Sequence, residues 1–366
     1  MNTDSSSFNP KVLLLTLIAF CLAFAVVVMG AYVRISHAGI SCPDWPLCYG
    51  HLVMPTSKAD IDKAHKKFPT AKKVEGHKAI KEMTHRFMAG TLGLLVFVIV
   101  GYCIRQRKRF PALFKLSLFL GLLIIFQAAL GAWTVTIRLM PIIVTSHLLF
   151  GFATLATLWI LYFKQKRLVV EDEQVQGNAF SKLVMAGILV LLLQIFLGGW
   201  TTSNYAQWAC IDFPTCKDKR WFPALDDKTA TALKSSDGNK LSVGISDFKK
   251  AFTIQTDTSI NYEHGNLKPS PRVAIHMTHR IGSIVTLIIL LIIGLIALIK
   301  KGYCGLRSTG LAMLLVLAAQ LALGVGNVLM HFAAPVAAAH NGFGALLLLM
   351  MITLYLRSRR LSVKAN

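Results

Sequence analysis

Four histidines stand inside or at the edge of long apolar stretches: His85, His147, His279 and His340. Ionisable side chains are costly at membrane depth, so they usually face the protein interior and mark a functional site. Two imidazoles on facing helices of a bundle can supply both axial ligands of a haem iron. We therefore expect two haem sites, one held by His85 and His147 and the other by His279 and His340.

Two other interpretations of these histidines have to be weighed. A buried hydrogen bond explains a single intramembrane histidine well, but it explains two equivalent pairs poorly. Zinc in a structural site takes four nitrogen, sulfur or oxygen ligands, and only Glu82 and His276 stand at the same depth as the pairs. Haem is therefore the favoured metal group.

The two pairs are equivalent because the chain contains an internal repeat. Three blocks of the first half match three blocks of the second half in residue type and spacing. The matched strings are GAY to CPDWPLC at 30–48 with GGW to CIDFPTC at 198–216, EMTHR at 82–86 with HMTHR at 276–280, and the Gln-x3-Gly segments that begin at Gln127 and Gln320. The repeat predicts two halves with the same orientation in the membrane.

The repeat breaks at one position close to a histidine pair. Glu82 stands one helical turn before His85, whereas the second half has His276 in the equivalent place. An acidic group beside a haem can transfer protons or stabilise positive charge on a substrate, so we predict Glu82 to be catalytic; a plain carboxylate at the membrane boundary is the simpler alternative. Arg86 and Arg280 follow the histidines and are placed to contact haem propionates, although snorkelling explains them almost as well.

Four of the seven cysteines form two Cys-x5-Cys loops, Cys42 with Cys48 and Cys210 with Cys216. Both loops are expected on the external, oxidising side of the membrane, where disulfides persist. Structural disulfides are the simpler interpretation, and redox-active pairs that relay reducing equivalents near Glu82 are the alternative. A c-type haem attachment site would need Cys-x-x-Cys-His, which the sequence lacks.

Membrane helices must position these residues, and the composition of the chain predicts such helices. Hydrophobic residues make up 54% of the 366 residues and charged residues 15%, which leaves too little polar surface for a soluble globule. One span needs about 20 apolar residues. We expect an all-α integral membrane protein with eight transmembrane helices at 11–34, 83–103, 112–137, 142–163, 182–202, 274–299, 308–330 and 335–356.

The expected spans divide the chain into two tandem pseudo-symmetric four-helix bundles. The N-terminal half covers residues 1–163, with an external loop at 35–81. The C-terminal half covers residues 182–366, with a longer external loop at 203–273, and residues 164–181 form a cytoplasmic linker.

The net charge of +22 marks membrane topology and not a nucleic-acid partner. With the N-terminus and C-terminus both cytoplasmic, four Lys/Arg clusters fall on the cytoplasmic side, as the positive-inside rule requires. These clusters lie at 105–109, 164–167, 300–301 and 357–360.

Eight lysines in the external loop 35–81 disagree with the positive-inside rule. We interpret them as a solvated or lipid-facing surface, with a docking surface for an acidic partner as the alternative. The first span lacks a cleavage site and no transit peptide precedes it, so it is expected to be retained and the location to be a bacterial inner membrane.

Taken together, these residues resemble the haem A synthase family. The resemblance covers nearly the whole chain and rests on eight spans in two halves, the string at 82–86, His147, the pair of His279 and His340, and the paired external cysteines. It implies an oxidoreductase that converts a methyl group of haem O to a formyl group, through a hydroxymethyl intermediate. The product, haem A, would supply terminal cytochrome oxidase.

The resemblance also implies a task for each site residue. His85 and His147 would hold the substrate haem O beside Glu82, while His279 and His340 would hold a resident haem b. The implied partners are haem O and haem A, the lipid bilayer, haem O synthase and cytochrome oxidase assembly proteins, and a homo-oligomer stays open.

Two further functions are compatible with membrane histidine pairs. A dihaem b-type electron-transfer protein, linked to quinol, needs the four histidines but not Glu82, so it leaves the break in the repeat unexplained. A haem transporter or assembly scaffold would need an alternating pathway, which the short helix connections do not indicate.

Overall fold

The computed structural model describes residues 9–167, 179–227, 231–299 and 305–359. Within these residues eight helices are long and apolar enough to cross a membrane, as the sequence predicts. They are α1 (Pro10–Ile35), α3 (Gly76–Arg105), α4 (Pro111–Thr136), α5 (Pro141–Arg167), α6 (Ala179–Ser203), α8 (Pro269–Ile299), α9 (Leu306–Leu329) and α10 (Ala334–Ser358). The chain is a helical multi-pass membrane protein.

Several of these helices begin at a proline. Pro10, Pro111, Pro141 and Pro269 open α1, α4, α5 and α8, because the fixed φ of proline suits the first turn and its missing N–H is not needed there. The predicted starts at 83 and 274 are too late, since α3 begins at Gly76 and α8 at Pro269. Hydropathy does not detect these first turns, because they are polar.

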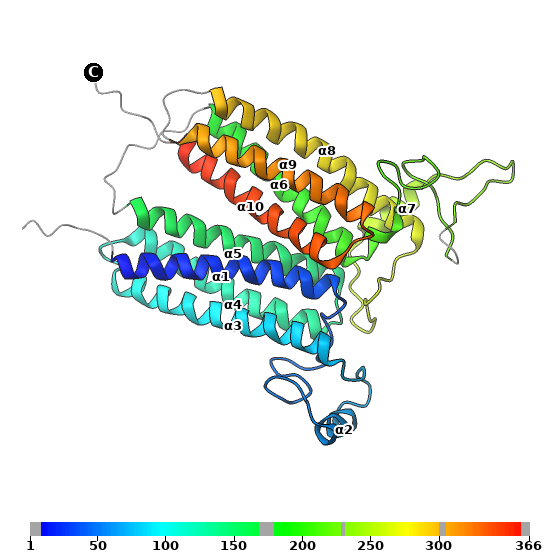
Figure 1. Cartoon of the computed structure of the whole chain (residues 1–366), viewed down its shortest axis with the longest axis horizontal. Helices are drawn as coiled ribbons and strands as arrows, with labels where there is room; N and C mark the ends of the chain where they lie inside the picture. Colours follow the sequence, from blue (N-terminus) through cyan, green and yellow to red (C-terminus); the bar gives the residue numbers. More distant parts are fainter. Residues whose placement is uncertain (1–8, 168–178, 228–230, 300–304, 360–366) are drawn as a thin grey trace, which may run out of the picture.

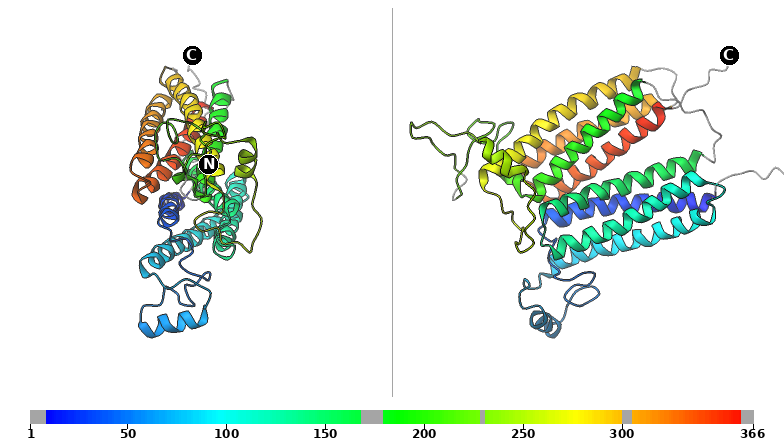
Figure 2. Two further views of the ribbon diagram at one scale, coloured as in Figure 1. Left: turned by 90° about the vertical axis from the view of Figure 1, so that its right-hand side faces the viewer. Right: turned by 180° about the vertical axis from the view of Figure 1, so that it is seen from behind.

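The eight helices form two groups of four (Figures 1 and 2). In the first group α1 and α4 each pack on α3 and α5, and in the second group α6 and α9 each pack on α8 and α10. The helices α3 and α5 therefore lie on one diagonal of their group, and α8 and α10 lie on one diagonal of theirs. The groups meet where α10 packs on α1 and α5, and where α5 packs on α6.

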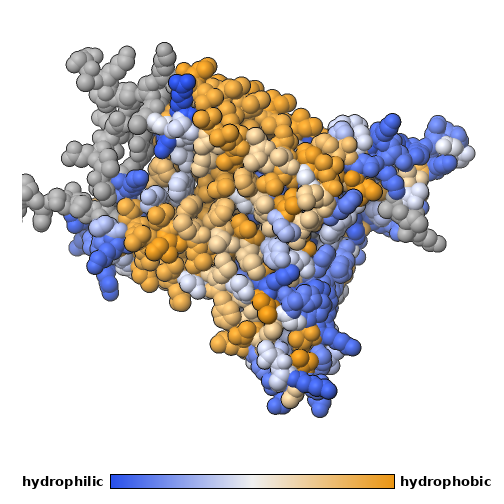
Figure 3. All heavy atoms as spheres, viewed as in Figure 1, coloured by the Kyte–Doolittle hydropathy of each residue, from blue (hydrophilic) through white to orange (hydrophobic). Residues whose placement is uncertain are grey.

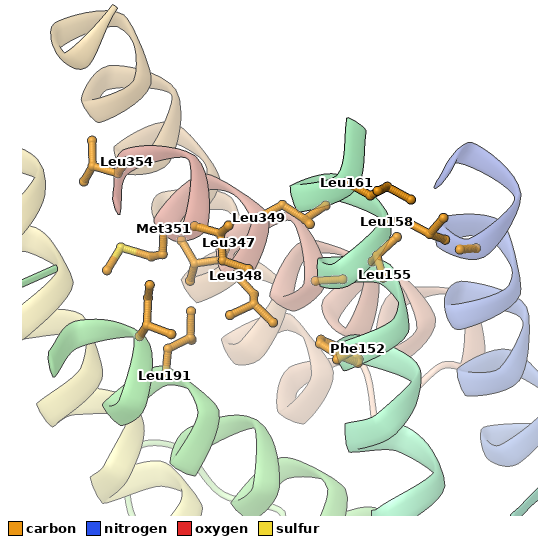
Figure 4. Close-up of a cluster of buried hydrophobic side chains, with 14 of the residues drawn as sticks. Phe152, Leu155, Leu158, Leu161, Leu191, Leu347, Leu348, Leu349, Met351 and Leu354 are labelled. Atoms are coloured by element: carbon orange, nitrogen blue, oxygen red, sulfur yellow. The ribbon is translucent and has the colours of Figure 1, made fainter. Parts of the chain in front are cut away.

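A buried apolar core joins the two groups. Leucine and methionine side chains of α5, α6 and α10 gather there, among them Leu158, Leu191 and Met351 (Figure 4). A polar contact also joins the groups, where Nε1 of Trp159 donates to Oγ1 of Thr353 at 2.8 Å. Since α10 contacts helices of both groups, 56% of its apolar stretch is buried, the largest share among the described helices.

The outer surface of the helices is apolar. Figure 3 shows a wide hydrophobic band over the helices, with hydrophilic residues gathered at the ends. Large side chains in this band point away from neighbouring helices; Leu94 is 69% exposed and Leu315 is 64% exposed. Such surfaces are stable against lipid and unfavourable against water, which agrees with a membrane location.

Two long segments connect α1 to α3 and α6 to α8 at the same end of the molecule (Figure 1). They contain α2 (Lys58–Lys67), the 3-10 turn η1 (Ala206–Ala209) and α7 (Ile245–Phe252), none of which the sequence analysis predicted. Ser57 caps α2, because its Oγ accepts a hydrogen bond from the backbone N–H of Asp60 at 3.1 Å.

Part of the predicted cytoplasmic side lies outside the described residues. This applies to residues 168–178 of the linker 164–181, to Lys300 and Lys301 of the third basic cluster, and to Arg360 of the fourth. The cytoplasmic location of the linker and of these three residues therefore stays a prediction.

Close helix packing gives a prediction for stability. A Cβ atom added to Gly310 of α9 would lie 2.8 Å from Cβ of Ala297 and 3.3 Å from the backbone oxygen of Gly294, both on α8. Neither atom can rotate away, so Gly310→Ala should lower the free energy of unfolding by about 1–3 kcal/mol. Gly101→Ala is the control, since nothing lies within 4 Å of its Cβ position. Equal thermal midpoints for both variants in detergent would contradict this packing.

Candidate functional site

The structure brings the four predicted histidines together in two pairs. His85 on α3 and His147 on α5 lie on one diagonal of the first group, and His279 on α8 and His340 on α10 lie on one diagonal of the second. All four residues are partly buried. The two histidines of each pair therefore lie on diagonally opposite helices of their bundle.

Each imidazole lies against a glycine of an adjacent helix. In all four cases Cε1 of the imidazole is 3.0 to 3.4 Å from the position that a Cβ atom on the glycine would take. The contacts join His85 to Gly30, His147 to Gly131, His279 to Gly198 and His340 to Gly324. These glycines come from α1, α4, α6 and α9, the other diagonal of each group. A larger residue at any of them would press on a ring.

Two equivalent glutamines approach one histidine of each pair. Nε2 of Gln127 on α4 donates to the backbone oxygen of His147 at 3.0 Å. Nε2 of Gln320 on α9 lies 3.4 Å from Nε2 of His340. In both bundles, a helix that supplies a glycine also supplies an amide beside the same histidine.

The polar surroundings of the other two histidines, His85 and His279, differ. Nε2 of Gln194 on α6 lies 3.0 Å from Nδ1 of His279 and donates to the backbone oxygen of His279 at 2.9 Å. The repeat places Val26 at the equivalent position of α1, so no such amide faces His85. The two pairs thus share their glycine contacts but differ in their polar surroundings.

The residues of both pairs fit a haem held by two axial histidines. The Nδ1 atoms of His85, His147 and His340 are buried and have no hydrogen-bond partner, so contacts within the protein leave these ring nitrogens unsatisfied. An unsatisfied buried polar atom costs about 1–3 kcal/mol, and ligation of an iron is a reason to retain it. Within the described part of the chain, no three His, Cys, Asp or Glu side chains cluster as a metal-ion site would need.

Glu82 is 4% exposed and holds the start of the loop that follows α1. Its Oε2 accepts hydrogen bonds from the backbone N–H of Ser41 at 2.8 Å, from Oγ of Ser41 at 2.9 Å and from the backbone N–H of Cys42 at 3.0 Å. Its Oε1 pairs with Nη2 of Arg86. The carboxylate therefore links α3 to the loop next to the first histidine pair.

Both predicted disulfides are present and join Cys42 to Cys48 and Cys210 to Cys216. All four cysteines are completely buried. The pairing that the spacing predicts is confirmed, whereas a redox role for these pairs stays a prediction.

Arg86 and Arg280 donate hydrogen bonds to the main chain of these disulfide loops. The acceptors are the carbonyl oxygens of Asp44 and Leu47 for Arg86 and of Asp212 and Thr215 for Arg280, at 2.6 to 2.9 Å. Both guanidinium groups are thus engaged in holding the loops on the helices. The contact of either arginine to a haem propionate stays a prediction.

His276 takes the place of Glu82 in the second half and is also 4% exposed. Its Nδ1 has no hydrogen-bond partner, and its ring meets that of Phe332 edge-on at 6.0 Å between centroids. Nη2 of Arg280, which has no glutamate beside it here, donates to the carbonyl oxygen of Cys210 at 2.8 Å. Glu82 and Arg86 hold the first disulfide loop, whereas Arg280 holds the second.

Sequence analysis missed the glycines and glutamines around the histidines. The signal was present, because Gly30 matches Gly198 in the first repeated block, and the Gln-x3-Gly segments from Gln127 and Gln320 match in the third. Uncharged residues retained in both halves beside the histidines could have indicated the contacts. Gln194 had no such signal, since the first half has a valine in its place.

The fold is that of a helical multi-pass membrane protein, and each of its two histidine pairs fits a haem. A family model described as cytochrome oxidase assembly protein matches residues 13–352. The heme A synthase of Shewanella oneidensis is 40% identical over 339 residues, which are 92% of this chain and 93% of the relative. The chain belongs to the haem A synthase family, as its motifs predict.

More distant relatives match a smaller part of the chain. The heme A synthase of Shouchella clausii is 26% identical over 54% of this chain and 61% of its own length. The heme A synthase of Flavobacterium psychrophilum is 27% identical over 58% of this chain and 68% of its own length.

The glycine contacts predict the effect of a single methyl group on haem binding. In Gly30→Ala the new Cβ would lie 3.0 Å from Cε1 of His85, so the ring has to shift, and haem affinity at the first pair should fall at least about tenfold. Gly131→Ala should have a smaller effect, because its distance to the ring is 3.4 Å. The measurement is haem content per protein from pyridine haemochrome spectra.

Gly93→Ala is the matched control for these variants. Gly93 lies on α3 like His85, and nothing lies within 4 Å of its Cβ position. If Gly30→Ala kept as much haem as Gly93→Ala, the glycine contact would not position the histidine.

Proposed function

We propose that this chain is a haem A synthase, which oxidises a methyl group of haem O to a formyl group through a hydroxymethyl intermediate. The relative that shares 40% identity over 92% of the chain carries that name. One observation of the site carries the proposal: among the described residues, only the first histidine pair has a buried carboxylate, Glu82, one helical turn away. The product would supply terminal cytochrome oxidase, in keeping with the description of the family.

The two histidine pairs have different tasks in this proposal. His85 and His147 hold the substrate haem O, while His279 and His340 hold a resident haem b. A bound haem supplies the redox chemistry of its iron. The chain itself fixes the depth and rotation of each imidazole, through the glycine on one side of the ring and the helix that carries it.

The contacts of Glu82 favour one of its two predicted roles. Three donors on Oε2 and Arg86 on Oε1 all stabilise a negatively charged carboxylate, and charge-assisted hydrogen bonds are the stronger ones. We therefore assign to Glu82 the stabilisation of positive charge that develops on the substrate, and not the transfer of a proton.

Membrane topology and origin are part of the same proposal. The basic cluster at 105–109 lies between α3 and α4, at the opposite end of the helices from α2 and α7, which supports cytoplasmic termini and external disulfide loops in a bacterial inner membrane. The equal packing order of the two groups and the four equivalent glycines support two pseudo-symmetric halves that arose by duplication. Haem O synthase and cytochrome oxidase assembly proteins are the partners that this function requires.

A dihaem electron-transfer protein is the second candidate function. The equivalent glycine contacts of the two pairs favour it, because an electron carrier needs two similar haem sites and no catalytic group. The buried Glu82 beside one pair favours the enzyme.

Conversion of haem in cells separates the two functions. The full chain is produced together with a source of haem O, and the bound haems are extracted and separated by chromatography. Hydroxylated or formylated haem is expected, and His147→Ala should abolish it. Only unmodified haems with the unaltered chain would reject the enzyme and leave the electron carrier.

Substitution of Glu82 tests the role of its charge. Glu82→Gln should keep both haems bound but lower conversion by about a hundredfold or more, because a neutral amide cannot stabilise positive charge on the substrate. Glu75→Gln, at the exposed start of the same helix and paired with Lys78, should convert haem O normally.

A third variant separates catalysis from loop anchoring. Ser41→Ala removes the hydroxyl bond to Oε2 of Glu82 but leaves the charge, so conversion should stay within a few-fold of the unaltered chain. Equal losses in Ser41→Ala and Glu82→Gln would mean that Glu82 acts only by holding the loop.

A further inference from the structure

The external segment after α6 borders a half-open cavity that the four predicted haem ligands do not line. Its volume is about 310 Å³, and its lining includes Tyr205, Trp208, Leu225, His264, Pro269 and Arg272. This volume is within the range of pockets for small organic ligands. The lining comes from η1, the segment before α8 and the first turn of α8.

Aromatic rings form one wall of the cavity. The ring of Tyr205 lies 6.3 Å from that of Trp208, nearly parallel to it, and 5.8 Å from that of His264. His37, at the end of α1, stacks on Trp208 from outside the lining at 5.7 Å. Flat walls of this kind favour a planar ring as the ligand.

The cavity also offers a few polar groups. Tyr205 is 3% exposed, and its buried hydroxyl has no hydrogen-bond partner. A ligand oxygen that accepts from this hydroxyl would remove a cost of about 1–3 kcal/mol. His264, whose side chain is 68% exposed, and Arg272 supply further N–H groups. These O–H and N–H donors suit a planar ligand that carries carbonyl oxygens.

The cavity lies beside exposed apolar side chains. Trp208 lines it and is itself 39% exposed, and Ile211 and Phe213, next along the chain, are 54% and 47% exposed. Aromatic and apolar residues at the end of a membrane helix are typical of the membrane–water interface. A ligand with an apolar tail can therefore enter from the lipid.

A row of ring contacts connects the cavity with the second histidine pair. Trp208 contacts Phe332 at 6.1 Å between ring centroids, and Phe332 contacts His276 at 6.0 Å. His276 stands one helical turn before His279 on α8. The cavity is thus next to the second pair, on its external side.

We propose that this cavity binds the head group of a membrane quinone. The planar ring would lie against Tyr205 and Trp208, its carbonyl oxygens would accept hydrogen bonds from Tyr205 and His264, and its isoprenoid tail would lie in the bilayer. The choice of a quinone rests on the proposed function, with water as the source of the formyl oxygen. Oxidation of a methyl group to a formyl group then releases four electrons and four protons, which two quinone molecules would take up to form two quinols. A phospholipid head group suits the cavity less well, since aromatic walls do not replace the hydration of a phosphate.

Quenching of tryptophan fluorescence by decylubiquinone tests the proposal. The full chain in nanodiscs should show saturable quenching, and Trp208→Phe should remove most of it while keeping an aromatic wall. Trp221→Phe is the matched control, because Trp221 is 42% exposed, like Trp208, but does not belong to the lining. Quenching that persists in Trp208→Phe would overturn the proposal.

Two further variants test the polar groups. Tyr205→Phe and His264→Ala should each raise the dissociation constant about tenfold, which corresponds to the loss of one hydrogen bond. His77→Ala, in the other external segment and with a side chain 70% exposed, should bind as the unaltered chain does. Equal affinities in all variants, with unchanged thermal midpoints, would reject the cavity as the binding site.

Binding is measured without turnover, so the two proposals can fail separately. A chain that converts haem O but does not bind decylubiquinone would reject the quinone site alone. A chain that binds decylubiquinone at Trp208 but leaves haem O unmodified would retain the site and reject the proposed function.

Discussion

An imidazole can enter a bundle of four helices only where an adjacent helix leaves room for it. Helix axes in such bundles lie about 8–10 Å apart, and the side chains between them normally fill that space. In this chain the room comes from glycines on α1, α4, α6 and α9, each of which contacts one histidine of the other diagonal. The positions of all four candidate ligands therefore depend on four residues that have no side chain.

The same constraint explains why the two histidine pairs are alike in geometry and different in chemistry. Glycine fixes where a ring lies, but it contributes no charge and no hydrogen bond. The polar groups nearby are free to differ: Gln194 faces His279, whereas Val26 takes its place near His85, and Glu82 and His276 occupy equivalent positions. Two halves with one architecture can in this way hold one site for a reaction and another for a resident group.

The spans and the histidine pairs could be predicted from the sequence, because lipid requires long apolar stretches and the repeat identifies equivalent residues. The disulfide pairing followed from cysteine spacing in the same way. Contacts across helices could not be predicted, since they depend on how each helix is rotated about its axis. Arg86 is an example: the sequence places it directly after His85, but it does not reveal that the disulfide loop folds back over α3 and presents its carbonyl oxygens to this side chain. The short helices α2 and α7 are polar, so hydropathy did not distinguish them from the loop residues around them.

The two longest helices are α3 and α8, with 30 and 31 residues, against 24 to 27 for the other six spans. Their additional first turns were unexpected from hydropathy, yet they place a ligand histidine and the residues that hold a disulfide loop on one continuous helix. Because Glu82, His85 and Arg86 share α3, the loop at Cys42 cannot move without the helix that positions the first imidazole. A rigid element that carries both a ligand and its surroundings maintains their geometry better than a loop could. The polar extension of α3 is therefore as much a part of the proposed reaction site as the histidine within the apolar span.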